Sequence, residues 1–512
     1  MIYSHTVYTA KDASLIPLFK SGKPMHSRYR PTAEVLPCQD ISGCLIVAGI
    51  GAGFHIKNTL LQNEHISLLV AVEADKESLE FCQHFEAVRE ASSMPAVVLC
   101  DAASIEETLK AHYIPAIHKN IALLFQRAWE SENPDTAQAV SNAVKRAIDQ
   151  IAADFSVQSH FGKLWHKNIL LNLSYICKLC STQEDAALAH CPTRFPVEKT
   201  AAIIAAGPSL DGCIEQIRAG SEKGELFVVA ADTAFGTLQK SGITPDAVVS
   251  IDAQHVSSRH FLCTPSSSKT MFVFDLCTPP ALAPYVASKG NAVLFVRTGH
   301  PLSALAAKAL TIPLLDSGSG TVTIAAADWA KSVGFRSLKF FGADFAYLNG
   351  KPYAKGTYLD AEFYTKTNRT RTAETSFCAL MFRCELKEAL GKSNAVTTEI
   401  LEGYGTSLLE WVRRNGFCKQ DGLFVKGDDA PLTTTLAQSA SGSSLSFQQF
   451  TQNVLHEIEA LLQGDEHTLI ERVLKSEVGV ALLPYFAFLK DSPLSESLKL
   501  AYRQTVRYNA PL

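Results

Sequence analysis

The residues best placed for chemistry follow a short apolar run at positions 201–206, a pattern typical of a buried strand. The turn after this run consists of Gly207, Pro208 and Ser209. Glycine and proline permit a sharp exit from the strand, and the next helix is expected near Gly212, with Ser209 or Asp211 as its N-cap. Free N–H groups and the helix dipole at such a turn favour a phosphate, so the turn is a candidate nucleotide site.

Two further predicted strands end in acidic residues. Leu226–Ala231 is followed by Asp232 and Thr233, and the run at 247–251 is followed by Asp252. The carboxyl ends of parallel strands form the edge at which an α/β sheet binds its ligand. We therefore expect these side chains near the ribose or the base of a nucleotide.

A serine- and glycine-rich loop precedes a predicted alanine-rich helix at 322–330. The loop residues are Ser317, Gly318, Ser319, Gly320 and Thr321. The start of this helix would offer a second anion-binding N-terminus. A plain N-cap by Ser319 or Thr321 is the alternative, and both interpretations can hold together.

The predicted strand at 338–341 leads into Asp344. A polar loop follows that contains Tyr347 and Tyr353, and we call it the tyrosine loop. An acid at a strand end is well placed for catalysis or for ribose binding. The aromatic residues of the loop alternate with glycine, asparagine and lysine, which favours an active-site flap over a packing element. A contact surface for a partner protein is the alternative.

A separate glycine motif lies near the N-terminus. Gly49, Gly51 and Gly53 follow a predicted strand, and Glu73 ends the next one. This spacing is typical of a dinucleotide or S-adenosylmethionine site, in which the glycines admit the ligand and the acid binds ribose hydroxyls. The competing interpretation is a Rossmann-like domain that has no ligand and packs against its neighbour.

The bulk properties favour a globular protein. The chain has 512 residues, of which 47% are hydrophobic and 19% charged, and its net charge of −4 does not indicate a nucleic-acid partner. No run reaches the roughly 18 apolar residues needed to span a bilayer, and the N-terminus lacks the pattern of a signal peptide. The 13 cysteines are scattered through apolar stretches, which predicts reduced thiols and a cytoplasmic protein. No metal site is expected, because the pair Cys177 and Cys180, with His190 and Cys191, lacks a second pair at ligand spacing.

The alternation of strand and helix patterns predicts an α/β fold. The N-terminal domain is expected to be Rossmann-like, the central domain to be a doubly wound sheet, and the C-terminal domain to be helical. The predicted boundaries are 1–125 for the N-terminal domain, 126–196 for a helical connector of two helices, 197–428 for the central domain, 429–445 for a linker and 446–512 for the C-terminal domain.

Several of these segments resemble the motility accessory factor (Maf) family, the flagellin glycosyltransferases of motile bacteria. The matching segments are 205–211, 231–252, 318–335 and 342–358, with a weaker match at 25–31. The central domain also resembles bacterial sialyltransferases that use a CMP-sugar donor, and the MptE-like 6-hydroxymethylpterin diphosphokinases.

The Maf resemblance implies a glycosyltransferase that moves a nonulosonic acid, of the pseudaminic or legionaminic type, from CMP to Ser or Thr of flagellin, with no required cofactor. The sialyltransferase resemblance implies that Tyr353 faces the leaving phosphate, with Tyr347 as a second tyrosine. It also implies that Gly207–Ser209 and the loop at 317–321 surround the donor nucleotide.

The catalytic base expected from the sialyltransferase resemblance is missing from this sequence. The sialyltransferases use a histidine after the tyrosine motif, but this chain has no histidine between His300 and His456. The remaining candidates for the base are Asp344, Asp252, His255 and Glu362.

Two other functions stay open. The pterin diphosphokinase resemblance implies pyrophosphate transfer from ATP with Mg²⁺ on acids such as Asp232, Asp252 and Asp344. The chain has no Walker loop, which disfavours this function. The other open function is that of a non-catalytic flagellar assembly or export factor. The tyrosine loop argues mildly against it.

Overall fold

A computed structural model of the chain gives its fold. The structure describes residues 1–181, 195–262, 264–266, 269–310, 312–318, 320–389, 391, 394–427, 447–465 and 468–509. The predicted linker at 429–445 therefore lies outside the described residues, as do Ser319, His190 and Cys191.

The chain divides into two compact units. The first comprises residues 1–163 and 458–501, and the second comprises 164–457 and 502–512. Helix α7, Pro134–Ser181, contributes to both, and it replaces the two connector helices that the sequence predicted. The domain boundaries given above stay predictions.

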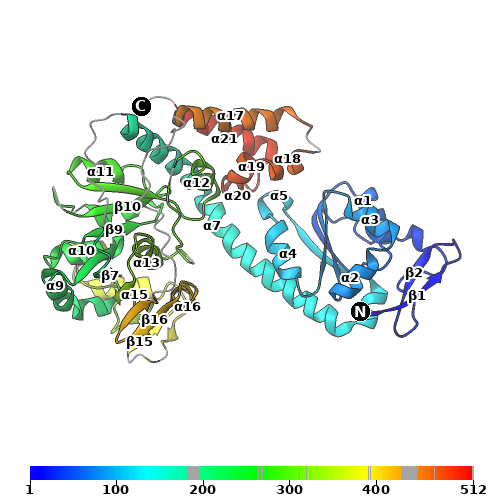
Figure 1. The fold of residues 1–512 in the computed structure, drawn as a ribbon, viewed down its shortest axis with the longest axis horizontal. Helices are drawn as coiled ribbons and strands as arrows, with labels where there is room; N and C mark the ends of the chain where they lie inside the picture. Colours follow the sequence, from blue (N-terminus) through cyan, green and yellow to red (C-terminus); the bar gives the residue numbers. More distant parts are fainter. Residues whose placement is uncertain are drawn as a thin grey trace. The chain divides into compact units, whose positions relative to one another are not determined.

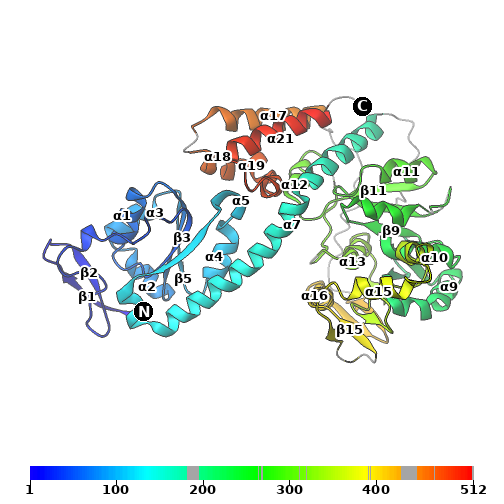
Figure 2. The same ribbon diagram turned by 180° about the vertical axis from the view of Figure 1, so that it is seen from behind.

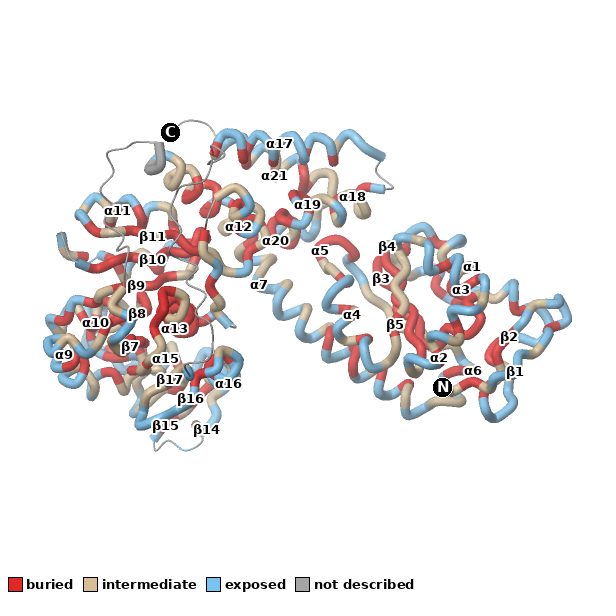
Figure 3. Tube along the Cα trace, in the orientation of Figure 1, coloured by how far each residue is buried: buried red, intermediate tan, exposed pale blue. Residues whose placement is uncertain are grey.

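The first unit contains a parallel sheet with the strand order β5-β4-β3-β6 (Figure 2). The strands are β3 Gly43–Ala48, β4 Ile66–Glu73, β5 Val97–Asp101 and β6 Ile121–Phe125. β3 and most of β4 are buried on both faces, which explains their continuous apolar sequences (Figure 3). The unit also has an antiparallel hairpin, β1 Tyr3–Thr9 and β2 Leu15–Phe19, which the sequence analysis did not predict.

Helices cover this sheet and extend the unit. They are α1 Phe54–Gln62, α2 Lys76–Cys82, α3 Glu86–Ser92, α4 Ile105–His112, α5 Pro115–His118, α6 Arg127–Glu132, α18 Leu469–Lys475, α19 Glu477–Ala481 and α20 Leu483–Phe488. The beginning of α7 packs on the same core through Ala137, Val140 and Val144. These residues recur three or four positions apart and so form one apolar face of the helix.

The second unit is built on a sheet with the order β11-β10-β9-β8-β7-β12-β17-β16 (Figure 1). Its parallel strands are β7 Thr200–Ile204, β8 Leu226–Ala231, β9 Ala247–Ser250, β10 Met271–Asp275, β11 Ala292–Val296 and β12 Ser337–Phe341. The hairpin β16 Phe417–Gln420 and β17 Leu423–Lys426 adds an antiparallel edge. The predicted strands at 201–206, 226–231, 247–251 and 338–341 match β7, β8, β9 and β12 to within two residues at either end.

Helices lie on both faces of this sheet, so the doubly wound α/β prediction is confirmed. α13, Val322–Ser332, is almost entirely buried against β7, β8 and β9 (Figure 3). On the other face, α10, Asp232–Lys240, packs through Phe235 on the ring of Phe272. The turn η3, His255–Phe261, lies beside α10.

The remaining elements of this unit include the tyrosine loop and the helices that flank it. They are η2 Pro208–Gly212, α9 Ile214–Glu222, α11 Leu282–Ser288, α12 Pro301–Ala306, β13 Tyr347–Leu348, α14 Tyr358–Thr365, α15 Ala373–Met381, β14 Lys387–Glu388, β15 Ala395–Thr397 and α16 Glu399–Arg414. Two C-terminal helices, α17 Phe447–Gln463 and α21 Leu494–Asn509, contribute residues to both units. Within the described ranges, no helix combines the length and apolar character that crossing a bilayer requires.

Candidate active site

The candidate site lies at the carboxyl edge of the second sheet, where the direction of strand addition reverses. β7 is central, with β8 on one side and β12 on the other. The segments that leave β7 and β12 meet there, because the N–H of Gly207 donates to the carbonyl oxygen of Gly342 at 2.8 Å. Such a switch point is where open α/β sheets bind ligands.

The turn at 207–209 is held by Asp344. The N–H of Ser209 donates to Asp344 Oδ2 at 2.8 Å, so this predicted phosphate donor is already bonded within the protein. A side chain at position 207 would lie 2.4 Å from the Gly342 oxygen and 2.5 Å from Asp344 Oδ2, which explains the glycine. Asp344 thus supports the turn, and a phosphate that approached the Ser209 N–H would compete with it.

Neither predicted cap lies where the sequence suggested. α9 begins at Ile214, two residues after the expected position, and its N-cap Cys213 makes no side-chain cap bond. Asp211 instead accepts the N–H of Lys355 at 2.9 Å. Since the N–H of Ala354 also donates to the Ala206 oxygen at 2.9 Å, the tyrosine loop is fastened to the turn.

Asp232 and Asp252 lie together beside this edge. Asp232 is buried, and its carboxylate accepts bonds from the Thr233 N–H at 2.6 Å and the Ser250 hydroxyl at 2.6 Å. Asp252 accepts the Gln254 N–H at 2.9 Å. Burial raises the pKa of Asp252, and the negative charge of Asp232 raises it further, whereas His260 opposes the shift. A carboxylate with a raised pKa is a stronger base than an exposed aspartate.

Tyr353 lies close enough to Asp232 for that acid to influence its hydroxyl. Burial of its hydroxyl, followed by the effects of Tyr347, Tyr358 and Asp232, raises the pKa of Tyr353 to about 12. The side chain is nevertheless 36% exposed, so part of the ring faces solvent. Its phenol is therefore protonated at neutral pH and is available as a hydrogen-bond donor.

Tyr347 lies in β13, close enough to influence the Tyr353 hydroxyl. The chain on either side of it has left-handed backbone, because Phe345 and Asn349 have φ values of 47° and 51°. A bulky residue in the left-handed region is uncommon, and such strain is often found at functional sites. The strain follows directly after Asp344, which supports a functional role for this loop.

The loop at 317–321 caps α13. Thr321 is the N-cap and accepts the Thr323 N–H at 3.3 Å, which confirms one of the two predicted caps. The N–H groups of Gly320 and Thr321 donate to the Ser317 oxygen at 3.0 and 3.1 Å, and that of Gly318 to Asp316. The Asp316 carboxylate pairs with Arg414 of α16. The contacts of this loop run to α13 and α16, whereas those of the 207–209 turn run to Asp344 and the tyrosine loop.

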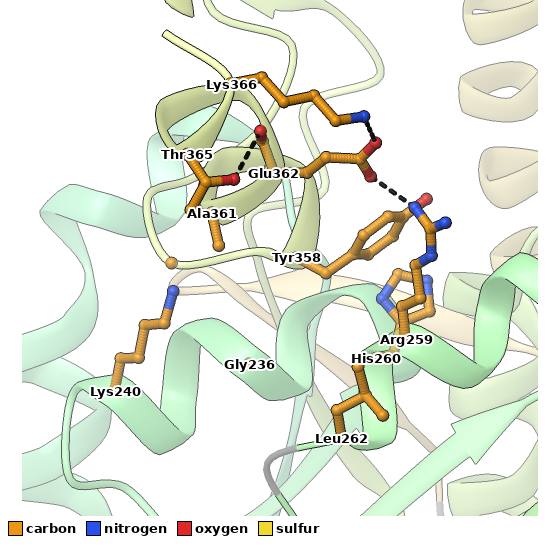
Figure 4. Close-up of a pocket in the computed structure, with 11 residues that line it drawn as sticks. Gly236, Lys240, Arg259, His260, Leu262, Tyr358, Ala361, Glu362, Thr365 and Lys366 are labelled. Carbon is orange, nitrogen blue, oxygen red and sulfur yellow. Dashed lines mark hydrogen bonds and ion pairs between the residues drawn. The ribbon is translucent and has the colours of Figure 1, made fainter.

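A pocket of about 480 Å³ lies between α10, η3 and α14 (Figure 4). Its charged and aromatic lining comprises Lys240, Arg259, His260, Tyr358, Glu362 and Lys366. Glu362 joins Arg259 at 2.6 Å and Lys366 at 2.5 Å, and its pKa is lowered, first by Lys366. Glu362 is thus a poor candidate for the base.

Sequence reasoning missed Arg259, His260 and Lys366 as site residues. Their segments give no motif: Arg259 and His260 lie in a short turn after β9, and Lys366 follows α14 along the chain. The usable signal was the position of η3 at the carboxyl end of a predicted strand. His255, which had been considered as a base, is exposed at the start of that turn.

The glycine motif of the first unit is filled by the protein itself. Glu73 is fully buried, and its carboxylate accepts the Trp129 indole N–H at 2.6 Å, the Tyr3 hydroxyl at 3.1 Å and the Ile50 N–H at 3.1 Å. A side chain at Gly51 would lie 2.5 Å from His26 Nε2. These contacts favour the interpretation of a Rossmann-like domain without ligand.

A histidine and carboxylate cluster lies next to this motif. His26, Glu34 and His55 bring possible ligand atoms within 4.8 Å of one another. However, the Ala52 N–H donates to His26 Nε2 at 2.8 Å, so the ring proton is on Nδ1, where it donates to Glu34 Oε2 at 2.6 Å. A metal on Nδ1 would require an imidazolate ring, so the cluster fits a structural hydrogen bond better than a metal site.

Comparison with known proteins agrees with this organisation. Residues 167–350 match the family described as 6-hydroxymethylpterin diphosphokinase MptE-like. An uncharacterized protein of Treponema pallidum (strain Nichols) is 38% identical over 146 residues, which cover 28% of this chain and 52% of that relative. A second from the same organism is 35% identical over 165 residues, which cover 32% of this chain and 72% of the relative.

Among solved structures, the Maf glycosyltransferase from Magnetospirillum magneticum AMB-1 is similar over 99% of this chain and 91% of its own, with a TM-score of 0.57 and 14% identity. The resemblance that the motifs suggested is thus confirmed by an MptE-like central domain and by this fold. The match to the first Treponema relative spans only about half of that protein. The chain belongs to the same family as the second Treponema pallidum protein, and its fold is that of the Maf glycosyltransferase.

Proposed function

We propose that the second unit is a cytoplasmic glycosyltransferase that moves a nonulosonic acid from its CMP carrier to a Ser or Thr hydroxyl of flagellin. The observation that carries the proposal is that the tyrosine loop is hydrogen-bonded to the turn after β7, at the switch point of a Maf-like fold, with Asp232 and Asp252 following the next two strands.

The reaction breaks the bond between the sugar's anomeric carbon and the phosphate oxygen, and it forms a bond from that carbon to the acceptor oxygen. CMP leaves with increased negative charge on its phosphate. A phenol with a pKa of about 12 stays protonated, so Tyr353 would donate a hydrogen bond to this developing charge.

The acceptor hydroxyl must lose its proton as the new bond forms. Asp252 is the preferred base, because burial raises its pKa, whereas Glu362 is held by two cations and Asp344 supports the turn. The proton would pass to the Asp252 carboxylate. No step requires a metal ion.

Nucleotide binding is the first test. A ligand at 100 times its dissociation constant stabilises a domain by roughly 2.7 kcal/mol, which moves the melting temperature by several degrees. We expect this shift with CMP and not with UDP or S-adenosylmethionine, and we expect Ser209→Trp to abolish it. Absence of CMP binding would refute the proposal.

Transfer to flagellin tests the base. Asp252→Asn is expected to lower the rate by about 10²–10⁴-fold while CMP still binds. A base must be ionised, so wild-type activity should fall as the pH drops through the raised pKa of Asp252, at a higher pH than for an exposed aspartate. An unchanged rate in this variant would exclude Asp252 as the base.

A second function is favoured by the MptE-like match at 167–350. Pyrophosphate transfer from ATP would use Mg²⁺, which prefers carboxylate oxygens such as those of Asp232 and Asp252. A thermal shift with ATP and Mg²⁺ but not with CMP would establish this alternative. If no nucleotide shifts the melting temperature, a non-catalytic flagellar assembly factor would be favoured instead.

A further inference from the structure

The pocket between η3 and α14 has a marked excess of positive charge. Three cations line it, Lys240, Arg259 and Lys366, against the single carboxylate of Glu362 (Figure 4). Its volume of about 480 Å³ is in the usual range for a small-molecule site. The charge favours an anionic occupant over a neutral one.

Arg259 is the best-oriented of these cations. Its Nη1 donates to Glu362 Oε2 at 2.6 Å, which fixes the guanidinium at the rim of the pocket beside Tyr358 (Figure 4). A guanidinium has five N–H groups, so this bond leaves further donors with the fork geometry that suits a carboxylate. Lys366 pairs with the other oxygen of Glu362 and so helps to hold this carboxylate in place.

The pocket adjoins the proposed reaction centre. Tyr358 lines it, and the pKa of Tyr358 is raised by burial first and then by acids that include Glu362, Asp252 and Asp232. The tyrosine loop connects the pocket to the turn at 207–209. The N–H of Lys355 donates to Asp211, which follows this turn, and the next residue, Gly356, lines the pocket. On the proposed function, a donor whose nucleotide lies on the turn would extend its sugar toward this loop and the pocket that the loop borders.

We infer that this pocket binds the transferred sugar and that Arg259 binds the sugar's carboxylate. The inference rests on the proposed function, since a nonulosonic acid carries one carboxylate and a neutral sugar carries none. An acidic segment of the acceptor protein is the competing occupant. It would make the pocket sensitive to flagellin and indifferent to the sugar.

Calorimetry with matched ligands tests this assignment. The probes are CMP, CMP-N-acetylneuraminic acid and the methyl ester of that sugar nucleotide, which removes only the carboxylate charge. We expect wild type to bind the acid at least about 10-fold more tightly than the ester. Arg259→Gln should weaken binding of the acid about 10- to 100-fold and leave the affinities for CMP and the ester unchanged.

The controls separate this inference from the proposed function. Arg413→Gln removes an exposed arginine of α16 and should change none of the three affinities. If CMP binds but Arg259→Gln leaves the preference for the acid intact, the pocket assignment is wrong and the proposed function stands. If wild type binds neither CMP nor either sugar nucleotide, the proposed function fails and the inference fails with it. A melting temperature equal to that of wild type would show that Arg259→Gln is folded.

Discussion

The two units place a glycine-containing loop at the same topological position, yet they use it differently. In each sheet the first strand of the parallel order, β3 or β7, is flanked by the next strand and by a later one, β6 or β12. In the first unit the loop after β3 donates its N–H groups inward: Ile50 to Glu73 at 3.1 Å and Ala52 to His26 at 2.8 Å. The space that a ligand would need is occupied by buried side chains.

In the second unit the equivalent loop is held by Asp344, by the Gly342 carbonyl oxygen and by the tyrosine loop. Beyond it lie a tyrosine that is 36% exposed and an open, positively charged pocket. The difference shows that a glycine-rich strand–loop–helix does not by itself define a nucleotide site. In the first unit the acid after the next strand, Glu73, accepts the loop's own Ile50 N–H, whereas its counterpart Asp232 accepts bonds from Thr233 and Ser250 and leaves the loop to Asp344.

The largest effect is expected for Glu73→Ala. Three buried donors, the Trp129 indole, the Tyr3 hydroxyl and the Ile50 N–H, would lose their acceptor, at about 1–3 kcal/mol each. We expect a loss of about 3–5 kcal/mol in the free energy of unfolding, measured by urea denaturation. CMP binding by the folded variant should be unchanged. A stable variant that had lost binding of a nucleotide would show instead that the first unit holds a ligand.

Tyr353→Phe should have the opposite profile. Removing one hydroxyl that stabilises a leaving group lowers turnover by about 10²–10³-fold, which corresponds to about 3–4 kcal/mol in the transition state. Because Tyr353 is partly exposed, the melting temperature should change little. Transfer kinetics and a melting curve on the same preparation provide the measurement. Tyr347→Phe is the matched control and should have a smaller effect, and equal losses in the two variants would contradict the assignment.

The fold could be predicted because buried parallel strands give continuous apolar runs. The run at 226–231 became β8 with the same limits, and the alanine-rich helix became α13. β6, with the sequence IALLF, was missed because the run is short and no motif follows it. The hairpin of β1 and β2 was missed because its second strand contains Pro17 and it lacks a two-residue turn signal.

The site could be predicted only in part. Asp232, Asp252 and Tyr353 were found because strand ends and motifs locate them along the chain. The use of Asp344 as a support for the Ser209 N–H could not be predicted, because it depends on a contact between segments 135 residues apart. The hydrogen bond from Arg259 to Glu362 joins residues 103 positions apart, so the sequence could not predict it either.

The smallest predicted effect is a difference in stability between two glycine variants of the first unit. It tests why the loop after β3 has no space for a ligand. Gly51 has a φ of 53°, and a methyl group there would lie 2.5 Å from both His26 Nε2 and the Met25 side chain. Gly22, in the same unit, has a φ of 82°, but a methyl group would meet no described atom within 4 Å. Gly22→Ala should therefore lose only the cost of the left-handed backbone, about 1–2 kcal/mol.

Gly51→Ala should lose about 1–3 kcal/mol more than Gly22→Ala, because His26 and Met25 must move. Urea denaturation of both variants gives the difference directly. If the two variants are equally destabilised, the His26 side chain is not packed tightly on the loop. Glu73 alone would then exclude a ligand from the loop after β3. The two units would differ only in where one carboxylate lies beside the loop.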